Sequence, residues 1–207
     1  MIFYVVYVKG EVIADCLNAI LFLAKPSIKH RAHITVRGPY EQTCDMSAIN
    51  ASFDTIPIVL DGVGRFTNPD QHVVYLSCKA KGLEPIAWRS DFPSYIPHLT
   101  LYSGPSPELA DEIYAIANRY QYHISLYATK LEPLIVRGRG APFSSVAFNG
   151  KQVSVIAGHD IRAVLVPTLS LHQRLGAIDR LCKYVSQISE IYKGRLKSLT
   201  WDKIKSS

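Results

Sequence analysis

The sequence predicts an α+β fold whose strands and helices form two similar halves, and three observations lead to this prediction. Polar and apolar residues alternate in several short segments bounded by glycine or proline, which is typical of half-buried strands. Other segments carry apolar residues at intervals of three and four, which is typical of amphipathic helices. Both ends of residues 1–136 contain a strand–helix–strand order, which favours two α+β halves over the alternating βαβ units of a parallel sheet.

The first half begins with a predicted strand at residues 3–8, followed by a predicted helix at residues 11–24. The helix has one apolar stripe and ends where a proline follows, because proline cannot continue a helix. The next strand, residues 31–37, is expected to stop at a Gly-Pro turn. Two further strands are predicted at residues 58–60 and 72–78, joined by a glycine-containing loop.

The second half is also predicted to contain strands and helices, in a different order along the chain. Residues 82–88 are expected to form a short helix, and residues 94–102 a strand. A helix is predicted at residues 107–120, since Ser106 is a suitable N-cap and Pro107 suits the first turn. The last segments expected to be extended lie at residues 123–127 and 131–136.

The character of the sequence changes after residue 136. A basic glycine loop is followed by segments expected to be extended around Val146 and at residues 153–156, and then by a long amphipathic helix at about residues 170–193. The apolar stripe of this helix consists of Leu171, Ile178, Leu181, Val185, Ile188 and Tyr192. We therefore expect a core at residues 1–136 and a C-terminal extension at residues 137–207. The helix is expected to pack on its own domain, with docking of a protein partner or self-association as the alternative.

One short motif occurs twice, as His33-Ile34-Thr35 and as His98-Leu99-Thr100. Side chains alternate along a strand, so each histidine should lie beside its threonine on one face while the middle residue packs into the core. Two such strands could bring two imidazoles and two hydroxyls to one groove. Imidazoles titrate near neutral pH and can transfer protons, and hydroxyls can donate hydrogen bonds to phosphate oxygens.

Neither a metal site nor a cofactor site is predicted. The sequence lacks the phosphate-binding loop, the His-Glu-x-x-His zinc motif, the dinucleotide fingerprint and the serine nucleophile elbow. His30 and His33 could suggest a metal pair, but their odd spacing would place them on opposite faces of one strand.

The two motifs and their surroundings resemble the two-histidine (2H) phosphoesterase superfamily, which includes the 2′-5′ RNA ligase and cyclic phosphodiesterase group. The first matching stretch is His33-Ile34-Thr35-Val36-Arg37-Gly38-Pro39-Tyr40, and the second is Pro97-His98-Leu99-Thr100-Leu101-Tyr102. Between them, residues 60–66 resemble the strand and Gly-x-Phe turn that often border the groove of these proteins. The likeness covers about residues 1–136, and residues 137–207 have no counterpart in it.

This resemblance implies a bilobal fold in which two pseudo-symmetric sheet-and-helix lobes flank a central cleft. It also implies metal-independent cleavage of a phosphodiester, such as a 2′,3′-cyclic phosphate or a 2′-5′ linkage in RNA or a nucleotide. His33 and His98 would be the general acid and base, in an order that the near-symmetric pair leaves open, and Thr35 and Thr100 would bind the phosphate.

Four further residues are candidates for substrate binding. Tyr40, Phe66 and Tyr102 could stack on a nucleobase, and Tyr102 is the best of the three because it shares the polar face of its strand with His98 and Thr100. Arg37 could contact phosphate if its strand continues that far. Core packing is the alternative for the aromatic residues, and solvation is the alternative for Arg37. Arg137 and Arg139 are weaker candidates.

Charge and cysteine content bound the partners and the compartment. Much of the net charge of +6 belongs to residues 193–207, which carry +4, so it does not mark the groove. The four cysteines are scattered, and the apolar start resembles a first strand rather than a signal peptide, so we expect a cytoplasmic protein without a membrane segment. A non-catalytic module that binds RNA ends or cyclic nucleotides, and a 2′-5′ phosphodiesterase or RNA ligase, remain the alternatives to a cyclic phosphodiesterase.

Overall fold

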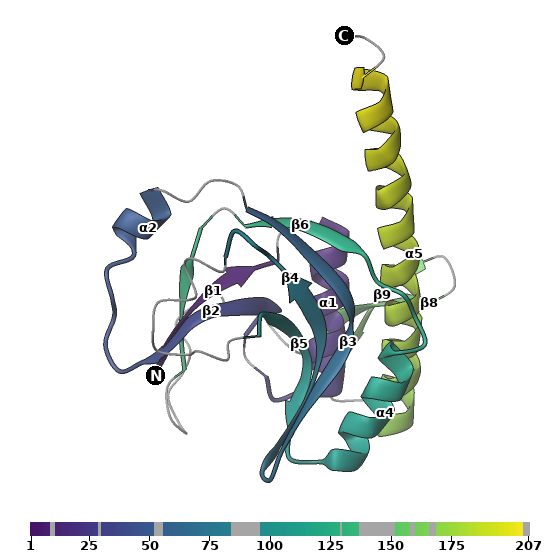
Figure 1. Ribbon diagram of the computed structural model, residues 1–207. Helices are drawn as coiled ribbons and strands as arrows, with labels where there is room; N and C mark the ends of the chain where they lie inside the picture. Colours follow the sequence, from purple (N-terminus) through teal and green to yellow (C-terminus); the bar gives the residue numbers. More distant parts are fainter. Residues whose placement is uncertain are drawn as a thin grey trace.

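The computed structural model describes residues 1–8, 11–28, 30–51, 56–83, 96–128, 130–136, 152–157, 160–165 and 169–204 (Figure 1). Seven strands form one sheet in which each neighbouring pair runs antiparallel. From edge to edge they are β6 (Ile124–Ala128), β3 (Ile56–Asn68), β4 (Gln71–Lys79), β5 (His98–Gly104), β2 (His33–Tyr40), β1 (Ile2–Tyr7) and β7 (Glu132–Ile135). The predicted α+β class is confirmed.

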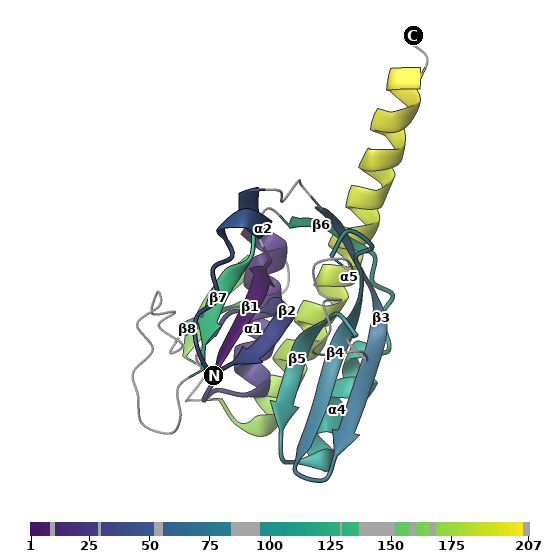
Figure 2. The ribbon, with the colours of Figure 1, turned by 60° about the vertical axis from the view of Figure 1, so that its left-hand side comes forward.

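The helices of the described residues are α1 (Glu11–Ala24), α2 (Ser47–Ala51), α4 (Pro107–Ala117) and α5 (Leu171–Ile204). A separate hairpin consists of β8 (Gln152–Ala157) and β9 (Asp160–Leu165), and its first strand packs on α1 and α5. Helices α1 and α4 pack against strands of the sheet, and α5 packs against both helices (Figures 1 and 2). Strand side chains that point toward these helices therefore form the core, and those that point away are available for a site.

The two halves of the sheet meet where β2 pairs with β5. Figure 2 shows β1, β2 and β7 on one side of this junction and β3, β4 and β5 on the other. Ile34 of β2 and Leu99 of β5 are direct partners, and both are fully buried. The middle residues of the two His-x-Thr motifs therefore lie in the core at the centre of the sheet, as their apolar character predicts.

Helix α1 is buried on more than its predicted stripe. The predicted stripe consists of Val12, Cys16, Ile20 and Leu23. Its last three members are buried but Val12 is exposed, and Leu17 and Phe22, which lie outside the stripe, are buried too. The cause is that α1 lies between the sheet and α5 and also contacts β8. A helix that is covered on several sides needs apolar residues nearly all round.

Helix α5 belongs to the same core in its first half. Ile178, Leu181 and Val185 are buried in the cluster that also contains residues of α1, α4 and the sheet. The helix continues to Ile204, beyond the predicted end near residue 193, and its last turns project away from the other elements (Figures 1 and 2). No helix in the described ranges is both long enough and apolar enough to cross a membrane.

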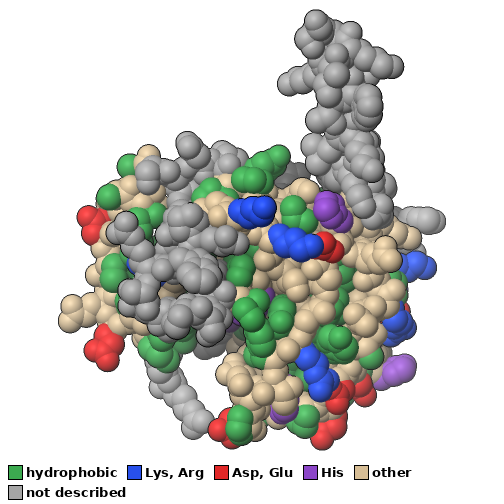
Figure 3. Space-filling view, viewed as in Figure 1, with side chains coloured by type: hydrophobic (Ala, Val, Ile, Leu, Met, Phe, Trp, Pro, Cys, Tyr) green, Lys and Arg blue, Asp and Glu red, His purple; other side chains and the backbone are tan. Residues whose placement is uncertain are grey.

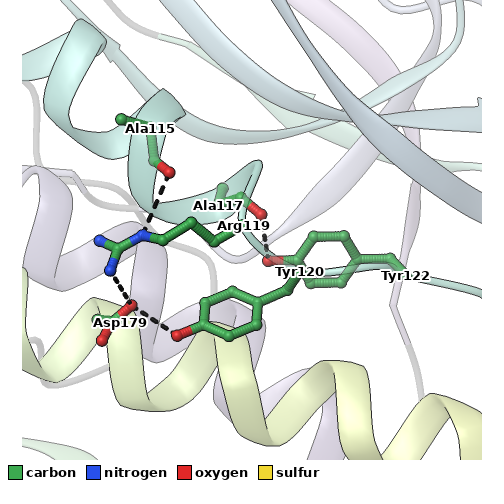
Figure 4. A network of polar contacts seen from close by, with 6 residues as sticks. All are labelled: Ala115, Ala117, Arg119, Tyr120, Tyr122 and Asp179. Carbon is green, nitrogen blue, oxygen red and sulfur yellow. Dashed lines mark hydrogen bonds and ion pairs between the residues drawn. The ribbon is translucent and has the colours of Figure 1, made fainter.

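Polar contacts fix α5 to the segment that follows α4 (Figure 4). The Asp179 carboxylate of α5 accepts a hydrogen bond from the Tyr120 hydroxyl at 2.7 Å and lies 3.5 Å from the Arg119 guanidinium. On the other side, the Tyr122 hydroxyl donates to the Ala117 carbonyl at 3.1 Å. The two contacts of Asp179 orient α5, and the Tyr122 bond holds the segment to α4. Burial of apolar residues supplies most of the free energy that holds α5 in place.

Several predicted element boundaries are corrected. The predicted loop between residues 60 and 72 is wrong, because β3 and β4 continue through it as a long hairpin. A bulge at Gly62, which has a φ of +81°, bends β3 there. The expected stop at Gly38 is also wrong, since β2 continues to Tyr40.

Other boundaries agree with the prediction or fall outside the structure. The Ser106 cap is confirmed, because its Oγ accepts from the Leu109 backbone N–H at 3.1 Å. The strand that carries the second motif begins at His98 and not at residue 94, where its start was predicted. Val146 and most of the helix expected at residues 82–88 lie outside the described residues.

We predict that Leu181→Ala destabilises the protein by about 2–5 kcal/mol, because it leaves a cavity between α5 and the core. Leu171→Ala is the matched control in the same helix, since Leu171 is exposed, and should change stability by less than about 0.5 kcal/mol. Urea unfolding measures both values. Equal and small effects would contradict the inclusion of α5 in the core.

Candidate active site

The two His-x-Thr motifs lie next to each other in antiparallel register. Because Ile34 pairs with Leu99, the register places His33 opposite Thr100 and Thr35 opposite His98. The side chains of Ile34 and Leu99 fill the core, so these four polar side chains project from the opposite face and are half-buried. The structure thus brings together all four predicted catalytic residues, related by a local two-fold axis.

A bulge follows each motif at the same position. Thr35 pairs with Val5 but Arg37 pairs with Tyr4, which leaves Val36 as an extra residue in β2. In β5, Thr100 pairs with Tyr75 and Tyr102 with Val74, which leaves Leu101 as the extra residue. Bulges bend a strand and redirect its side chains, so each motif strand turns just after its threonine.

Both histidines make the same hydrogen bond to the backbone. His33 Nδ1 lies 2.7 Å from the Arg31 carbonyl oxygen, and His98 Nδ1 lies 2.8 Å from the Ile96 carbonyl oxygen. A carbonyl can only accept, so in both rings Nδ1 carries the proton and donates. Nε2 of each ring is then the atom that can take up or release a proton.

His33 is surrounded by groups that disfavour its charged form. Burial lowers the pKa of His33 to about 4, the nearby imidazoles of His30 and His98 also lower it, and the Arg31 carbonyl acts in the opposite direction. The rings of His30 and His33 meet edge to face with centroids 4.9 Å apart, and the ring centroid of Tyr7 in β1 lies 6.1 Å from that of His33. His33 is therefore neutral near pH 7.

His98 lies in an aromatic cluster instead. Its ring centroid is 5.2 Å from that of Phe66 and 5.0 Å from that of Tyr75, and these two aromatic rings stack on each other at 4.4 Å. Burial lowers the pKa of His98, and the hydrogen bond to Ile96 partly offsets this effect. The His30 imidazole, whose ring packs on His33, is not among the groups that shift the pKa of His98.

Gly64 makes room for this cluster. A Cβ at Gly64 would lie 2.4 Å from Cζ of Tyr75, whose ring therefore crosses β3 directly above the glycine. Phe66 stacks on that ring two residues later on the same strand. The Gly-x-Phe pattern identified in the sequence is thus part of a strand rather than a turn, and its physical role is to position aromatic rings against His98.

The four predicted substrate-binding residues fare differently. Phe66 lies beside His98, as expected. The expectation that Tyr102 faces the groove is wrong, because the Leu101 bulge turns Tyr102 into the core, where it is 3 % exposed. The Val36 bulge likewise breaks the spacing that placed Arg37 on the face of Thr35.

Tyr40 lies at the far end of β2, where its ring centroid is 6.0 Å from that of Tyr4. It is thus near the core rather than next to the motif residues. Arg137 and Arg139 lie outside the described residues.

Three groups near the histidines were missed by sequence reasoning. His30 was assigned to the opposite face of the strand from His33, which is wrong because β2 begins only at His33 and His30 lies in the preceding bend. Tyr7 could have been found from the alternation of its strand, whereas Tyr75 could be placed only by the pairing of β4 with β5. Burial and the Glu132 carboxylate raise the pKa of Tyr7, which keeps this hydroxyl protonated.

Metal ligands are sparse in the part of the chain that the structure describes. It contains no group of three or more His, Cys, Asp or Glu side chains able to hold a metal ion. The groups that converge on the motif face are two imidazoles, two hydroxyls and aromatic rings, which are suited to proton transfer and to hydrogen bonding with an oxyanion.

We predict that Gly64→Ala displaces the Tyr75 ring and destabilises the protein by about 1–3 kcal/mol, because the added methyl group overpacks the site. The imidazole resonances of His98 should shift in NMR spectra, since its ring neighbour has moved. Gly176→Ala in α5, where the nearest atom is 3.8 Å away, is the control and should be neutral or stabilising. Unchanged stability and unchanged His98 resonances in Gly64→Ala would refute this packing role.

The resemblance to the two-histidine phosphoesterases depends on the two motifs and the strand between them. No protein-family model matches the chain, and no curated protein matches it. The function must therefore be inferred from the motif residues and the groups packed around them.

Proposed function

We propose that the protein is a metal-independent phosphodiesterase that hydrolyses a 2′,3′-cyclic phosphate, or a related phosphodiester of a nucleotide or an RNA end. The observation that carries this proposal is the antiparallel register of the two motifs through Ile34 and Leu99. It brings two imidazoles and two hydroxyls to one face of the sheet, related by a local two-fold axis, where they would bind a phosphate between them. A binding protein would have no need for two proton-transfer groups.

The same register supports the two-lobed organisation that the family resemblance implies. Strands β2 and β5 lie at the centre of the sheet, each with a helix-backed half beside it. The motif residues project from the face opposite to α1 and α4, so the groove would run along the junction of the two halves.

The asymmetry around the histidines supports distinct roles for them. His33, which is neutral because of burial and His30, would act as the general base and take a proton from the attacking water at Nε2. His98, whose pKa is not shifted by His30, would hold the proton more readily and give it to the departing ribose oxygen. An anionic phosphate bound between the rings would favour the charged form of His98 further.

The threonines would bind the phosphate and Phe66 would contact the base. Thr35 and Thr100 would donate their hydroxyl hydrogen bonds to the non-bridging oxygens, on which charge increases in the transition state. The half-buried ring of Phe66 next to His98 is the best placed of the predicted aromatic residues for stacking. Arg37 and Tyr40 remain weaker candidates for contacts at the end of β2.

The charge on the described face seen in Figure 3 favours a small substrate or an RNA end over a long duplex. Among the described residues seen in Figure 3, basic side chains are scattered between acidic and apolar ones and form no continuous basic surface. Several basic groups are paired, such as Lys79 with Asp61 and Arg65 with Asp111. Binding of long nucleic acids depends mainly on many unpaired cations along the backbone path.

We predict that His33→Ala and His98→Ala each reduce hydrolysis of 2′,3′-cyclic nucleotides at least about 10²-fold, since each removes one proton-transfer group. His172→Ala, an exposed histidine of α5, is the control and should keep full activity. The assay is product formation in the presence of a chelator, scored for 2′- or 3′-phosphate, with folding checked by circular dichroism. Retained turnover in either folded variant, or binding without any product in the unaltered protein, would exclude the proposed mechanism.

The pKa values predict an optimum of kcat/KM on the acid side of neutrality. His33 must be unprotonated, so activity is lost as the pH falls toward about 4. His98 must be protonated, so activity is also lost as the pH rises through its pKa, which burial lowers. The optimum should therefore lie above about pH 4 and on the acid side of neutrality, and a pH series of kcat/KM measures it.

A variant sharpens this test. His30→Gln removes the imidazole that helps to lower the pKa of His33, so the acidic limb should move to higher pH. His172→Gln should leave the profile unchanged. An optimum above neutral pH would contradict the assignment of His33 as the base. An acidic limb of the kcat/KM profile that stays at the same pH in His30→Gln would contradict it as well.

A further inference from the structure

We propose that Asn18 is a positioning residue for His33, which it holds through the peptide group between Arg31 and Ala32, and that Pro97 has the equivalent role for His98. The orientation and tautomer of the two imidazole rings do not depend on what the protein catalyses. Only the expected effect on turnover rests on the proposed function.

Two hydrogen bonds through one peptide group link Asn18 to His33. Asn18 of α1 accepts a hydrogen bond at Oδ1 from the Ala32 backbone N–H at 2.7 Å. The carbonyl of the same peptide group, that of Arg31, accepts from His33 Nδ1 at 2.7 Å. Because the peptide group is planar and rigid, the amide of Asn18 sets the direction in which this carbonyl points.

The burial of Asn18 indicates that its side chain has a specific role. Asn18 and Ser189 are the buried polar residues of the described chain. Ser189 donates to the Ser186 carbonyl one turn earlier in its own helix, which is a local bond. Asn18 instead reaches out of an otherwise apolar part of α1 to a segment 14 residues away, directly before the first motif. Burying an amide is costly unless it makes such a bond.

In the second motif, a proline rather than a side-chain amide restricts the peptide group that accepts from the histidine. His98 Nδ1 donates to the Ile96 carbonyl, but the following residue is Pro97, whose nitrogen carries no hydrogen. No side chain can therefore hold that peptide group from its nitrogen. The proline ring restricts the backbone instead, and the Pro97 carbonyl accepts from the Cys78 N–H of β4 at 3.1 Å.

The consequence for His33 is a fixed tautomer. A peptide group that donates to Asn18 is polarised, which strengthens the bond that its carbonyl accepts from Nδ1. His30 Nδ1 also lies 3.3 Å from this carbonyl, so the peptide group would be free to turn toward His30 if Asn18 did not hold it. Asn18 thus keeps the proton of neutral His33 on Nδ1 and leaves Nε2 as the base.

The test is the tautomer of each histidine, read from long-range ¹H–¹⁵N NMR spectra of the imidazoles. In the unaltered protein both His33 and His98 should be in the Nδ1–H form. Asn18→Leu, which keeps the size but removes the acceptor, should convert His33 to a mixture containing Nε2–H while His98 stays unchanged. Asn18→Asp retains an oxygen acceptor and should preserve the Nδ1–H form of His33.

Ser189→Ala is the matched control for loss of a buried polar group and should leave both tautomers unchanged. If His33 stays in the Nδ1–H form in Asn18→Leu, or if His98 changes together with it, the proposal is overturned. Should Asn18→Leu fail to fold, the unaltered protein still decides. The Ala32 amide hydrogen should exchange slowly with solvent there, and rapid exchange would exclude the bond to Asn18.

Turnover gives a separate readout. If the protein hydrolyses cyclic nucleotides, kcat should fall about 10- to 100-fold in Asn18→Leu with little change in KM, because a misdirected base affects the chemical step. An unchanged kcat in that variant would overturn the positioning role. If no hydrolysis is found in the unaltered protein, the proposed function fails, while the NMR result still decides whether Asn18 positions His33.

Discussion

The pairing of Ile34 with Leu99 is the contact on which the site depends. It joins the two halves of the sheet and, by burying both residues against the helices, it forces the flanking histidines and threonines to the other face. A shift of either strand by one residue would turn its own histidine and threonine into the core and separate them from the other pair. The hydrophobic effect at two positions thus determines where the polar chemistry of the protein can occur.

The local symmetry of the motifs is exact in the backbone pattern and broken in the surroundings. Each motif has a buried middle residue, a bulge one residue after its threonine, and a histidine that donates from Nδ1 to the carbonyl two residues earlier. The neighbours differ, because His33 has His30 and Tyr7 beside it while His98 has Phe66 and Tyr75. The two imidazoles therefore share one backbone geometry but have different neighbours, and different neighbours shift pKa values by different amounts.

Much of the architecture followed from local patterns in the sequence. Alternation located the strands, the Ser106-Pro107 pair located the start of α4, and the three- and four-residue spacing located α1 and α5. The errors share one cause. The glycines of β3 suggested a loop, but Gly62 supports a bulge and Gly64 accommodates Tyr75, and only the paired strand and the ring above it reveal those roles.

By itself, the sequence determined the class of fold and the four residues of the two motifs, because the period of a strand and the chemistry of histidine and threonine are local properties. Only the tertiary structure decided which other residues join them. Tyr102 is buried in the core, whereas Tyr75, His30 and Asn18 lie around the motif histidines. Bulges, strand pairing and the hydrogen bond of a buried amide place these residues, and they act between segments distant in the chain. Side-chain direction depends on register and packing, and neither can be read along one strand.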